Sequence, residues 1–285
     1  MSEKFLGAAQ IRQLASQLDL SPTKKWGQNF VIDPNTVRRI IDVSGVTAQD
    51  DVVEIGPGLG SLTVGLLAEA NSVVAVEIDE RLANQLPKTI SDLDSELSNK
   101  LIVLNEDALK ITELPTVATK LVANLPYNIS VPVILHFLEK FPSIREVLVM
   151  VQAEVGERLA AGPGSKIYGV PSVKARFYGD VSQVATISRQ IFWPVPNVDS
   201  VLVRIVRHEK SPDLAMKEQL FAVVDAAFSQ RRKTLRSALS SFLGGTAQVD
   251  VVLTAAGVSS GLRGEQLDIE AFLAIAQAAQ SKVTL

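Results

Sequence analysis

The 285-residue sequence contains no cysteine and only two histidines, His136 and His208. The lack of cysteine excludes disulfides, a thiolate nucleophile and cysteine-bound metal clusters. His136 falls in the apolar stretch VPVILHFL and is expected in the core, whereas His208 lies among charged residues and is expected at the surface. We therefore predict no metal site and assign neither histidine to catalysis.

Long apolar runs are also missing. No run approaches the roughly 20 residues that a membrane helix needs, and the N-terminus lacks an apolar signal core. Hydrophobic residues nevertheless make up 47% of the chain and charged residues 21%, a balance that supports a sizeable core. We expect a soluble, cytoplasmic protein with no membrane partner, built from one large and one smaller domain.

The net charge of −3 by itself argues against nucleic-acid binding, but the charges are unevenly distributed. Residues 41–120 hold five Lys/Arg against fourteen Asp/Glu, whereas residues 1–40 hold six against three and residues 121–285 hold seventeen against fourteen. The densest basic cluster consists of Arg231, Arg232, Lys233 and Arg236. A solvated helix face is the default explanation for such a cluster.

Short Val/Ile-rich runs, separated by helix-like segments, indicate buried strands. They span residues 51–55, 73–77, 101–104, 120–123 and 145–151. This alternation predicts an α/β fold with a doubly wound, mostly parallel sheet. The period-two segment 198–206 could complete the same sheet.

After about residue 209 the pattern changes to helical spacing with Ala-rich composition. The predicted helices lie near residues 215–228, 232–243, 248–256 and 268–281. We therefore divide the chain into an α/β domain over residues 1–208, in which residues 1–20 form an N-terminal extension, and an all-helical domain over residues 209–285.

A glycine-rich turn, Glu54-Ile-Gly56-Pro-Gly58-Leu-Gly60, joins the first strong strand to a helix. Glycines let a ligand approach the backbone, and the helix N-terminus offers free amides, so Gly56 and Gly58 are candidate cofactor contacts. The same turn is also needed simply to pack a helix against its strand. Both explanations stay open at this point.

Glu77 ends the next strand, where an acidic side chain can accept both ribose hydroxyls of a nucleoside cofactor. The spacing does not separate a nicotinamide cofactor from S-adenosylmethionine, although Ser61 occupies the third glycine position of GxGxxG and weakens the dehydrogenase alternative. Asp107, after the third strand, is placed either to accept a hydrogen bond from an adenine amine or to cap a helix.

The segment Asn124-Leu-Pro-Tyr-Asn-Ile-Ser130 follows the fourth strand at the carboxyl edge of the sheet, where ligands bind in such folds. An Asn-Pro loop can be a simple turn. It also supplies what methylation of an aromatic amine requires, because the Asn124 side chain and a Leu125 or Pro126 carbonyl would accept the amine hydrogens. Tyr127 would stack on the base. No strong general base is needed, because the methyl sulfonium is already activated.

With these motifs the chain resembles the ribosomal RNA adenine dimethyltransferase family of the KsgA or RsmA type over nearly everything after the first 20 residues. The matching segments are KKWGQNF (24–30), VEIGPGLGSLT (53–63), NLPYNIS (124–130), GPGSKIYGVPSV (162–173), FWPVPNVDSVLVR (192–204) and FSQRRKTLRSAL (228–239). The last segment distinguishes this branch from antibiotic-resistance relatives that act on large-subunit RNA. One departure is Asn197, where many relatives carry a basic residue.

The resemblance implies a Rossmann-like class I methyltransferase domain that binds S-adenosylmethionine. Asn29 and the Val31 backbone would join Gly56, Gly58, Glu77, Asp107 and Asn124 in holding this cofactor, and Phe192 would be the second aromatic partner of the flipped adenine, opposite Tyr127. The implied reaction places two methyl groups on each of two adjacent adenosines in the 3′-terminal hairpin of 16S rRNA. The implied partner is an immature small ribosomal subunit, bound by a monomeric enzyme that acts in ribosome biogenesis.

We predict the RNA surface at Arg231, Arg232, Lys233 and Arg236, with residues 232 and 236 on one face if the segment is helical. Lys24 and Lys25 are the next candidates. Two other functions are weighed. A non-catalytic nucleic-acid-binding or transcription factor of the same fold would tolerate loss of the NLPY loop and of Glu77, which are intact. A nicotinamide-dependent oxidoreductase would be stabilised by NAD rather than by S-adenosylhomocysteine.

Overall fold

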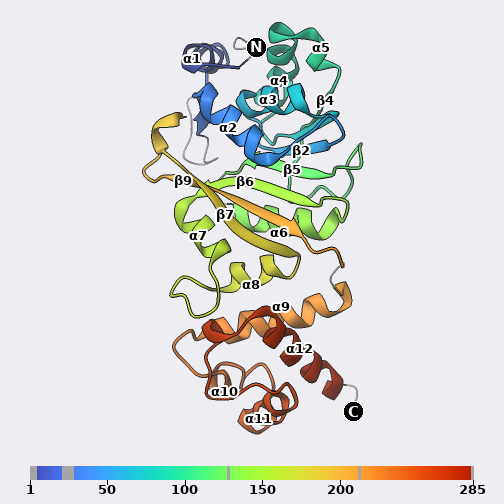
Figure 1. Cartoon of the computed structure of the whole chain (residues 1–285), viewed down its shortest axis with the longest axis vertical. Coiled ribbons are helices and arrows are strands. Elements are labelled where there is room, and N and C mark those ends of the chain that lie inside the picture. Colours follow the sequence, from blue (N-terminus) through green and yellow to red (C-terminus); the bar gives the residue numbers. More distant parts are fainter. Residues whose placement is uncertain (1–4, 21–28, 127–128, 211–212, 284–285) are drawn as a thin grey trace. The chain divides into compact units, whose positions relative to one another are not determined.

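The computed structural model describes residues 5–20, 29–126, 129–210 and 213–283 (Figure 1). The chain forms two compact units. The first comprises Met1–Gly156 and Ser182–Val206, and the second comprises Glu157–Val181 and Arg207–Leu285. Residues 157–181, which the sequence-based division placed before its boundary at 208, therefore group with the C-terminal helices. The functional assignment of the two predicted domains remains a prediction.

A seven-stranded sheet forms the centre of the first unit, with the strand order β4-β3-β2-β5-β6-β9-β7. The strands are β2 (Asp51–Ile55), β3 (Ser72–Val76), β4 (Leu101–Leu104), β5 (Lys120–Asn124), β6 (Glu146–Gln152), β7 (Gly179–Ile187) and β9 (Ser200–Arg207). Strands β4, β3, β2, β5 and β6 are parallel, and β9 pairs antiparallel with β6. The predicted Rossmann-like α/β class is confirmed.

The five predicted parallel strands agree with β2–β6 to within one residue at each end. The predicted segment 198–206 overlaps β9, which belongs to the same sheet as expected, although β7 and not β9 forms the edge. Their continuous apolar runs arise because both faces are buried: Val52 and Val53 in β2, like Val122 and Leu121 in β5, are at most 1% exposed. The sequence patterns missed β7, a sheet-edge strand whose residues alternate poorly in polarity, and the two-stranded pair of β1 (Phe30–Val31) with β8 (Phe192–Trp193).

Helices follow the strands of the first unit and continue through the second. They are α1 (Ala8–Gln17), α2 (Pro34–Ser44), α3 (Ser61–Glu69), α4 (Glu80–Leu93), α5 (Ser95–Ser98), α6 (Ser130–Lys140), α7 (Ala153–Ala160), α8 (Val170–Arg176), α9 (Leu214–Ser229), α10 (Leu235–Ala238), α11 (Thr246–Ala255) and α12 (Ile269–Val283). Short 3-10 turns cover Arg189–Ile191 and Gly264–Gln266. No helix within the described part of the chain has both the length and the apolar character to cross a membrane.

The predicted helix over residues 232–243 is wrong in extent, because only α10 is α-helical there. Residues 230–233 form a turn after α9, and residues 239–244 form further turns that end in Gly244 and Gly245, at φ angles of +81° and +126°. The Ala- and Leu-rich spacing thus indicated the buried positions Leu235, Ala238 and Leu239 but not the ends of the helix.

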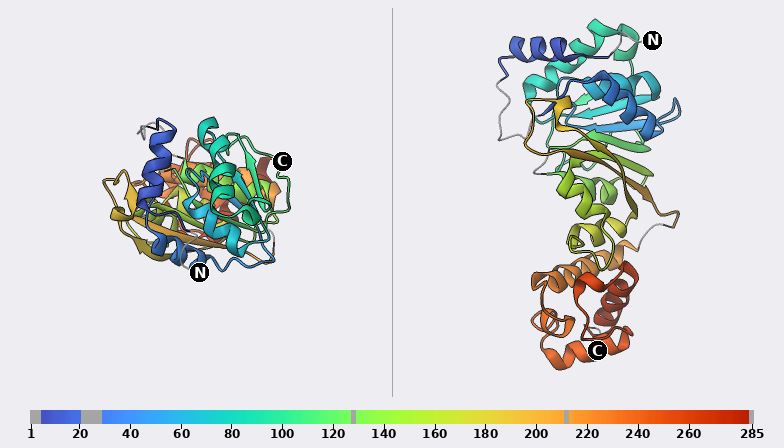
Figure 2. Two further views of the ribbon diagram at one scale, coloured as in Figure 1. Left: turned by 90° about the horizontal axis from the view of Figure 1, so that it is seen from above. Right: turned by 60° about the vertical axis from the view of Figure 1, so that its left-hand side comes forward.

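The N-terminal segment belongs to the core of the first unit. Leu6, Ile11 and Ala15 are at most 3% exposed and share one hydrophobic cluster with apolar residues of α2, α3 and α4. In the side view of Figure 2, α1 lies close to the helices that follow the first strands. The Arg38 guanidinium also lies over the Phe5 ring, 4.8 Å from the ring centroid, in a cation–π contact. Residues 5–20 of the N-terminal extension are therefore packed against this domain.

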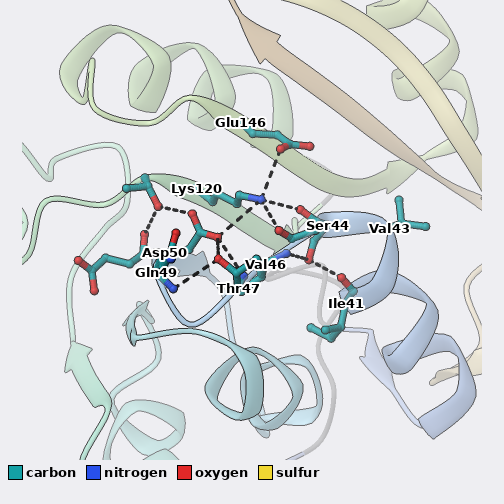
Figure 3. Close-up of polar contacts among 12 residues, drawn as sticks. Ile41, Val43, Ser44, Val46, Thr47, Gln49, Asp50, Lys120 and Glu146 are labelled. Carbon is teal, nitrogen blue, oxygen red and sulfur yellow. Dashed lines mark hydrogen bonds and ion pairs between the residues drawn. The ribbon is translucent and has the colours of Figure 1, made fainter.

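Lys120, at the start of β5, connects the C-terminal end of α2 to the sheet by hydrogen bonds (Figure 3). Its ammonium donates to the carbonyls of Ser44 (3.0 Å) and Gly45 (2.6 Å) and lies 3.5 Å from a Glu146 carboxylate oxygen and 3.8 Å from one of Asp50. A cation at a helix C-terminus satisfies the last carbonyls and the negative end of the helix dipole. This cluster lies at the amino end of β5, opposite the edge that carries the candidate site.

Candidate cofactor and catalytic site

A pocket of about 230 Å³ opens at the carboxyl ends of β2, β3 and β5. It brings together nine of the predicted site residues, namely Asn29, Val31, Gly56, Gly58, Glu77, Asp107, Asn124, Leu125 and Pro126. These residues come from five separate places in the sequence. The topology unites them because parallel strands present their carboxyl ends at one edge of the sheet.

The glycine-rich turn forms one wall of this pocket. Gly56, Gly58 and Gly60 have φ angles of +68°, +58° and +93°, values that side chains disfavour. At Gly58 space is limiting as well, because an added Cβ atom would lie 3.0 Å from the Phe30 ring. Helix α3 begins directly after Gly60 without a side-chain cap, so its first amides are oriented as at an anion- or dipole-binding helix N-terminus.

Glu77 is held at the bottom of the pocket by the backbone around it. Its carboxylate accepts hydrogen bonds from the amides of Gly58 (3.2 Å) and Asp79 (3.0 Å), and the Asn105 side chain donates to its carbonyl (2.8 Å). The residue is 5% exposed, and burial raises the pKa of its carboxyl. A carboxylate has about four acceptor positions, so capacity remains for the hydroxyls of a ribose.

Glu54 is a pocket residue that the sequence reasoning missed. It is 1% exposed, and its Oε2 atom has no hydrogen-bond partner among the described residues. Burial raises the pKa of its carboxyl to about 8, and the charge of Glu77 adds to the shift. The signal in the sequence is its position as an acidic residue at the end of the strand, two residues before Gly56 of the glycine-rich turn. A buried acceptor without a partner is suited to a cationic group of a ligand.

The opposite wall combines Asp107 with two exposed apolar side chains. Asp107 Oδ1 accepts a hydrogen bond from the Leu109 amide (3.0 Å), but residues 108–110 form a turn and not a helix, so Asp107 lines the pocket and stabilises a turn instead of capping a helix. Ile78 and Leu109 also line the pocket and are 48% and 37% exposed. Exposed apolar side chains beside a polar acceptor fit the faces and the edge of a purine ring.

The catalytic-loop residues that the structure describes are firmly anchored. The Asn124 side-chain nitrogen donates to the Asn29 carbonyl (3.1 Å), and the Leu125 amide donates to the Met150 carbonyl (3.1 Å). The Pro126 carbonyl accepts hydrogen bonds from the Ser130 hydroxyl (3.0 Å) and the Ile129 amide (3.3 Å). Of the two carbonyls predicted to accept the target amine, Leu125 is therefore the better candidate. Tyr127 lies outside the described residues.

Phe192 is placed beside the pocket but not in its lining. Its side chain is 1% exposed and packs in the core cluster, while its backbone pairs with Val31 through the β1–β8 strands. The neighbouring Trp193 stacks on Phe30 with ring centroids 6.3 Å apart. The Phe192 ring must become accessible before a base can stack on it, so its predicted role stays a prediction.

The predicted basic cluster lies in the second unit, and its geometry differs from the expected helical stripe. Arg231 pairs with Glu265 (3.1 Å) and donates to the Lys166 carbonyl (2.6 Å), and Arg236 pairs with Asp250 (2.9 Å). Arg232 lies in the turn before α10, so it does not share a helix with Arg236.

Arg232 and Lys233 are both exposed, and neither forms an ion pair with another described residue. These two side chains are the part of the cluster whose charge is available to a partner. Lys24 and Lys25, the alternative RNA surface, lie outside the described residues. Within the described part of the chain, no three acidic or histidine side chains are grouped as a metal site.

The fold is that of a class I methyltransferase of the Rossmann-like type, and its pocket lies at the carboxyl edge of the sheet. The family described as ribosomal RNA adenine dimethylase matches residues 20–281. The chain belongs to this family.

Relatives and solved structures agree with this assignment. The chain is 58% identical to ribosomal RNA small subunit methyltransferase A of Leifsonia xyli subsp. xyli, over 96% of this chain and 98% of that protein. It is 55% identical to the protein of the same name from Corynebacterium efficiens, over 96% of each. A dimethyladenosine transferase from Plasmodium falciparum has a similar structure, with a TM-score of 0.76 and 27% identity over 88% of this chain and 97% of that one. The structure of the 23S rRNA methyltransferase ErmE is also similar, with a TM-score of 0.67 and 26% identity over 88% of this chain and 100% of that one.

Proposed function

We propose that this protein is an S-adenosylmethionine-dependent enzyme that dimethylates the exocyclic amines of two adjacent adenosines in the 3′-terminal hairpin of 16S rRNA. The observation that carries the proposal is the position of Asn124 in the lining of the pocket, with its amide orientation fixed by the Asn29 carbonyl. The names of the relatives support the same reaction, since they act on ribosomal RNA of the small subunit.

The residues of the pocket fit the proposed cofactor. Glu77 would accept the ribose hydroxyls, and Ile78 and Leu109 would cover the adenine, whose amine Asp107 would bind. Gly56 and Gly58 give the backbone close access, and the buried Glu54 oxygen without a partner would face the ammonium group. Asn29 and Val31 close the pocket from the side of β1. When bound, S-adenosylmethionine supplies an activated methyl group on a sulfonium.

The chain's own contribution is to bind and orient the target amine. The adenine amine is a poor nucleophile because its lone pair is delocalised into the ring. Acceptance of its hydrogens by Asn124 Oδ1 and the Leu125 carbonyl would favour a pyramidal nitrogen with its lone pair directed at the methyl group. Tyr127 and Phe192 would hold the flipped base by stacking, which offsets the cost of extruding it.

The substrate is proposed to be an immature small subunit, bound by a monomeric, cytoplasmic enzyme. Residues 1–208 would carry the catalytic function and residues 209–285 would contribute to RNA binding. Arg232 and Lys233 are the strongest candidates for phosphate contacts because no described carboxylate neutralises them. Arg231 and Arg236 would act mainly by holding the turn in place, through their bonds to Lys166, Glu265 and Asp250.

The proposal is tested by incubating the purified protein with small subunits from cells that lack the modification, together with S-adenosylmethionine. Mass spectrometry of the RNA is expected to show four added methyl groups in the 3′-terminal hairpin. A thermal-shift control is expected to show stabilisation by S-adenosylhomocysteine and none by NAD. Methyl groups at another position, or none, would contradict the proposal.

A further inference from the structure

Strand β1 and Asn29, the residue directly before it, contact three parts of the candidate site. The Asn29 carbonyl accepts the hydrogen bond from the catalytic-loop residue Asn124 (3.1 Å). The Phe30 ring lies against Gly58 of the cofactor turn, and β1 pairs with β8, the strand that carries Phe192. Residues 29–31 thus connect the cofactor turn, the catalytic asparagine and the segment predicted to bind the target base.

One side chain fixes β1 from the cofactor side. The Ser61 hydroxyl, at the first residue of α3, donates a 2.6 Å hydrogen bond to the Val31 carbonyl. Ser61 is 6% exposed, so water does not readily replace this bond. Beyond Val31, the Ile32 amide donates to the Ile191 carbonyl (2.8 Å) and continues the attachment to the segment before β8. Without the hydroxyl, β1 would keep its pairing with β8 but lose its bond to α3.

The position of β1 matters for chemistry because of how Asn124 is held. A planar amide that donates through its nitrogen to Asn29 presents its oxygen on the other side, as an acceptor. A shift of the Asn29 carbonyl would rotate this amide and move the acceptor away from the target amine. Methyl transfer depends on alignment, so a small displacement at this atom reduces turnover more than it weakens cofactor binding, which many other pocket residues share.

We infer that Ser61 is a positioning residue for methyl transfer, which acts through β1 on the orientation of Asn124. The inference rests on the proposed function and deepens it, because it adds a residue of the pocket lining that acts through its bond to the Val31 carbonyl. It also gives a role to the serine that stands where dinucleotide-binding turns carry their third glycine.

The test is the turnover of Ser61→Ala at saturating cofactor and RNA, with S-adenosylhomocysteine affinity measured by calorimetry. Turnover is expected to fall about five- to tenfold, the equivalent of one hydrogen bond, while the dissociation constant rises by a clearly smaller factor. Ser61→Thr, which keeps the hydroxyl, is expected to retain most of the turnover. Ser61→Cys keeps the volume but weakens the bond, and serves in place of the alanine variant if that one does not fold.

Ser44→Ala is the matched control. Ser44 is also buried, and its hydroxyl also donates a 2.6 Å bond to a backbone carbonyl, that of Ile41, but it lies in the Lys120 cluster at the opposite end of the sheet (Figure 3). It is expected to lower the melting temperature as Ser61→Ala does and to leave turnover unchanged. Equal turnover in both variants, or a Ser61→Ala defect that appears only in the KM for cofactor, would overturn the inference. An inactive wild-type protein would overturn the proposed function as well.

Discussion

The raised pKa of the buried Glu54 carboxyl predicts that ligand binding releases a proton. With a pKa of about 8, this group is roughly nine-tenths protonated in the free protein at pH 7. The proposed ligand brings an ammonium group to the pocket, and a nearby positive charge favours the carboxylate. Binding of S-adenosylhomocysteine at pH 7 is therefore expected to release up to about 0.9 protons. Because Glu54 must lose its proton for the ligand to bind, the affinity for S-adenosylhomocysteine should rise by up to about tenfold per pH unit as the pH approaches 8. Above pH 8 the affinity should level off.

The perturbation is Glu54→Gln, which keeps the shape of the side chain and removes its titration. At pH 8 the variant should bind S-adenosylhomocysteine about 10- to 150-fold more weakly than wild type, the equivalent of roughly 1.5–3 kcal/mol for a hydrogen bond to a charged group. The difference should nearly vanish at pH 6, where wild-type Glu54 is itself neutral.

The same pKa affects stability in the absence of ligand. The folded-state pKa is raised above the unfolded value, so protonation stabilises the folded protein, and this contribution is lost as the pH rises toward 8. The free Glu54→Gln variant should therefore lose less stability than wild type between pH 6 and pH 8.

The assay is isothermal titration calorimetry from pH 6 to pH 9, in pairs of buffers that differ in ionisation enthalpy, so that released protons are counted directly. Glu106→Gln serves as the control, because Glu106 is an exposed carboxylate in the same pocket lining. It should release as many protons as wild type. A wild-type affinity that does not depend on pH, with no proton release, would refute the reasoning about Glu54.

Three further predictions concern the other groups of the site. Glu77→Gln should weaken S-adenosylhomocysteine binding by at least roughly 1.5 kcal/mol, because a carboxylate accepts ribose hydroxyls more strongly than an amide does; wild-type affinity by calorimetry in a folded variant would remove Glu77 from the site. Asn124→Ala should reduce single-turnover methyl transfer far more than RNA binding, whereas equal losses would mean that Asn124 supports the fold or the cofactor instead. Neutralising Arg232 and Lys233 together should weaken subunit binding and flatten its salt dependence, with cofactor affinity as the folding control. Arg236→Ala removes a charge that is already paired with Asp250, so it should change the salt dependence of subunit binding less than the Arg232/Lys233 double variant does. A larger change in Arg236→Ala would contradict the assignment of the phosphate contacts to Arg232 and Lys233.

The sheet and most of the pocket could be predicted because both are encoded locally. Buried parallel strands need continuous apolar runs, and ligands bind at their carboxyl ends, so Gly56, Glu77 and Asn124 could be placed at one edge from their positions alone. The structure confirms the sheet and brings these residues together.

What escaped prediction depends on contacts between distant segments. The two-residue strand β1 is too short to give a periodic signal, and its pairing with Phe192 and Trp193 spans more than half of the chain. The pairing of Arg231 with Glu265 and of Arg236 with Asp250 is likewise invisible in a local charge count. A run of basic residues shows where charge is concentrated, but only the fold decides which of those charges are already neutralised.

The grouping of residues 157–181 with the C-terminal helices limits how this protein can be cut or recombined. The Phe177 and Tyr178 rings pack on Phe221 at centroid distances of 5.7 and 6.4 Å, and the Tyr168 hydroxyl donates to the Leu267 carbonyl (2.8 Å). A fragment that stops at residue 208 would expose these aromatic rings to water and invite aggregation. A chimaera that exchanges the helical part with a relative must therefore carry two inserts, residues 157–181 and the chain from 207 onward. A single crossover would mix the two halves of one hydrophobic core.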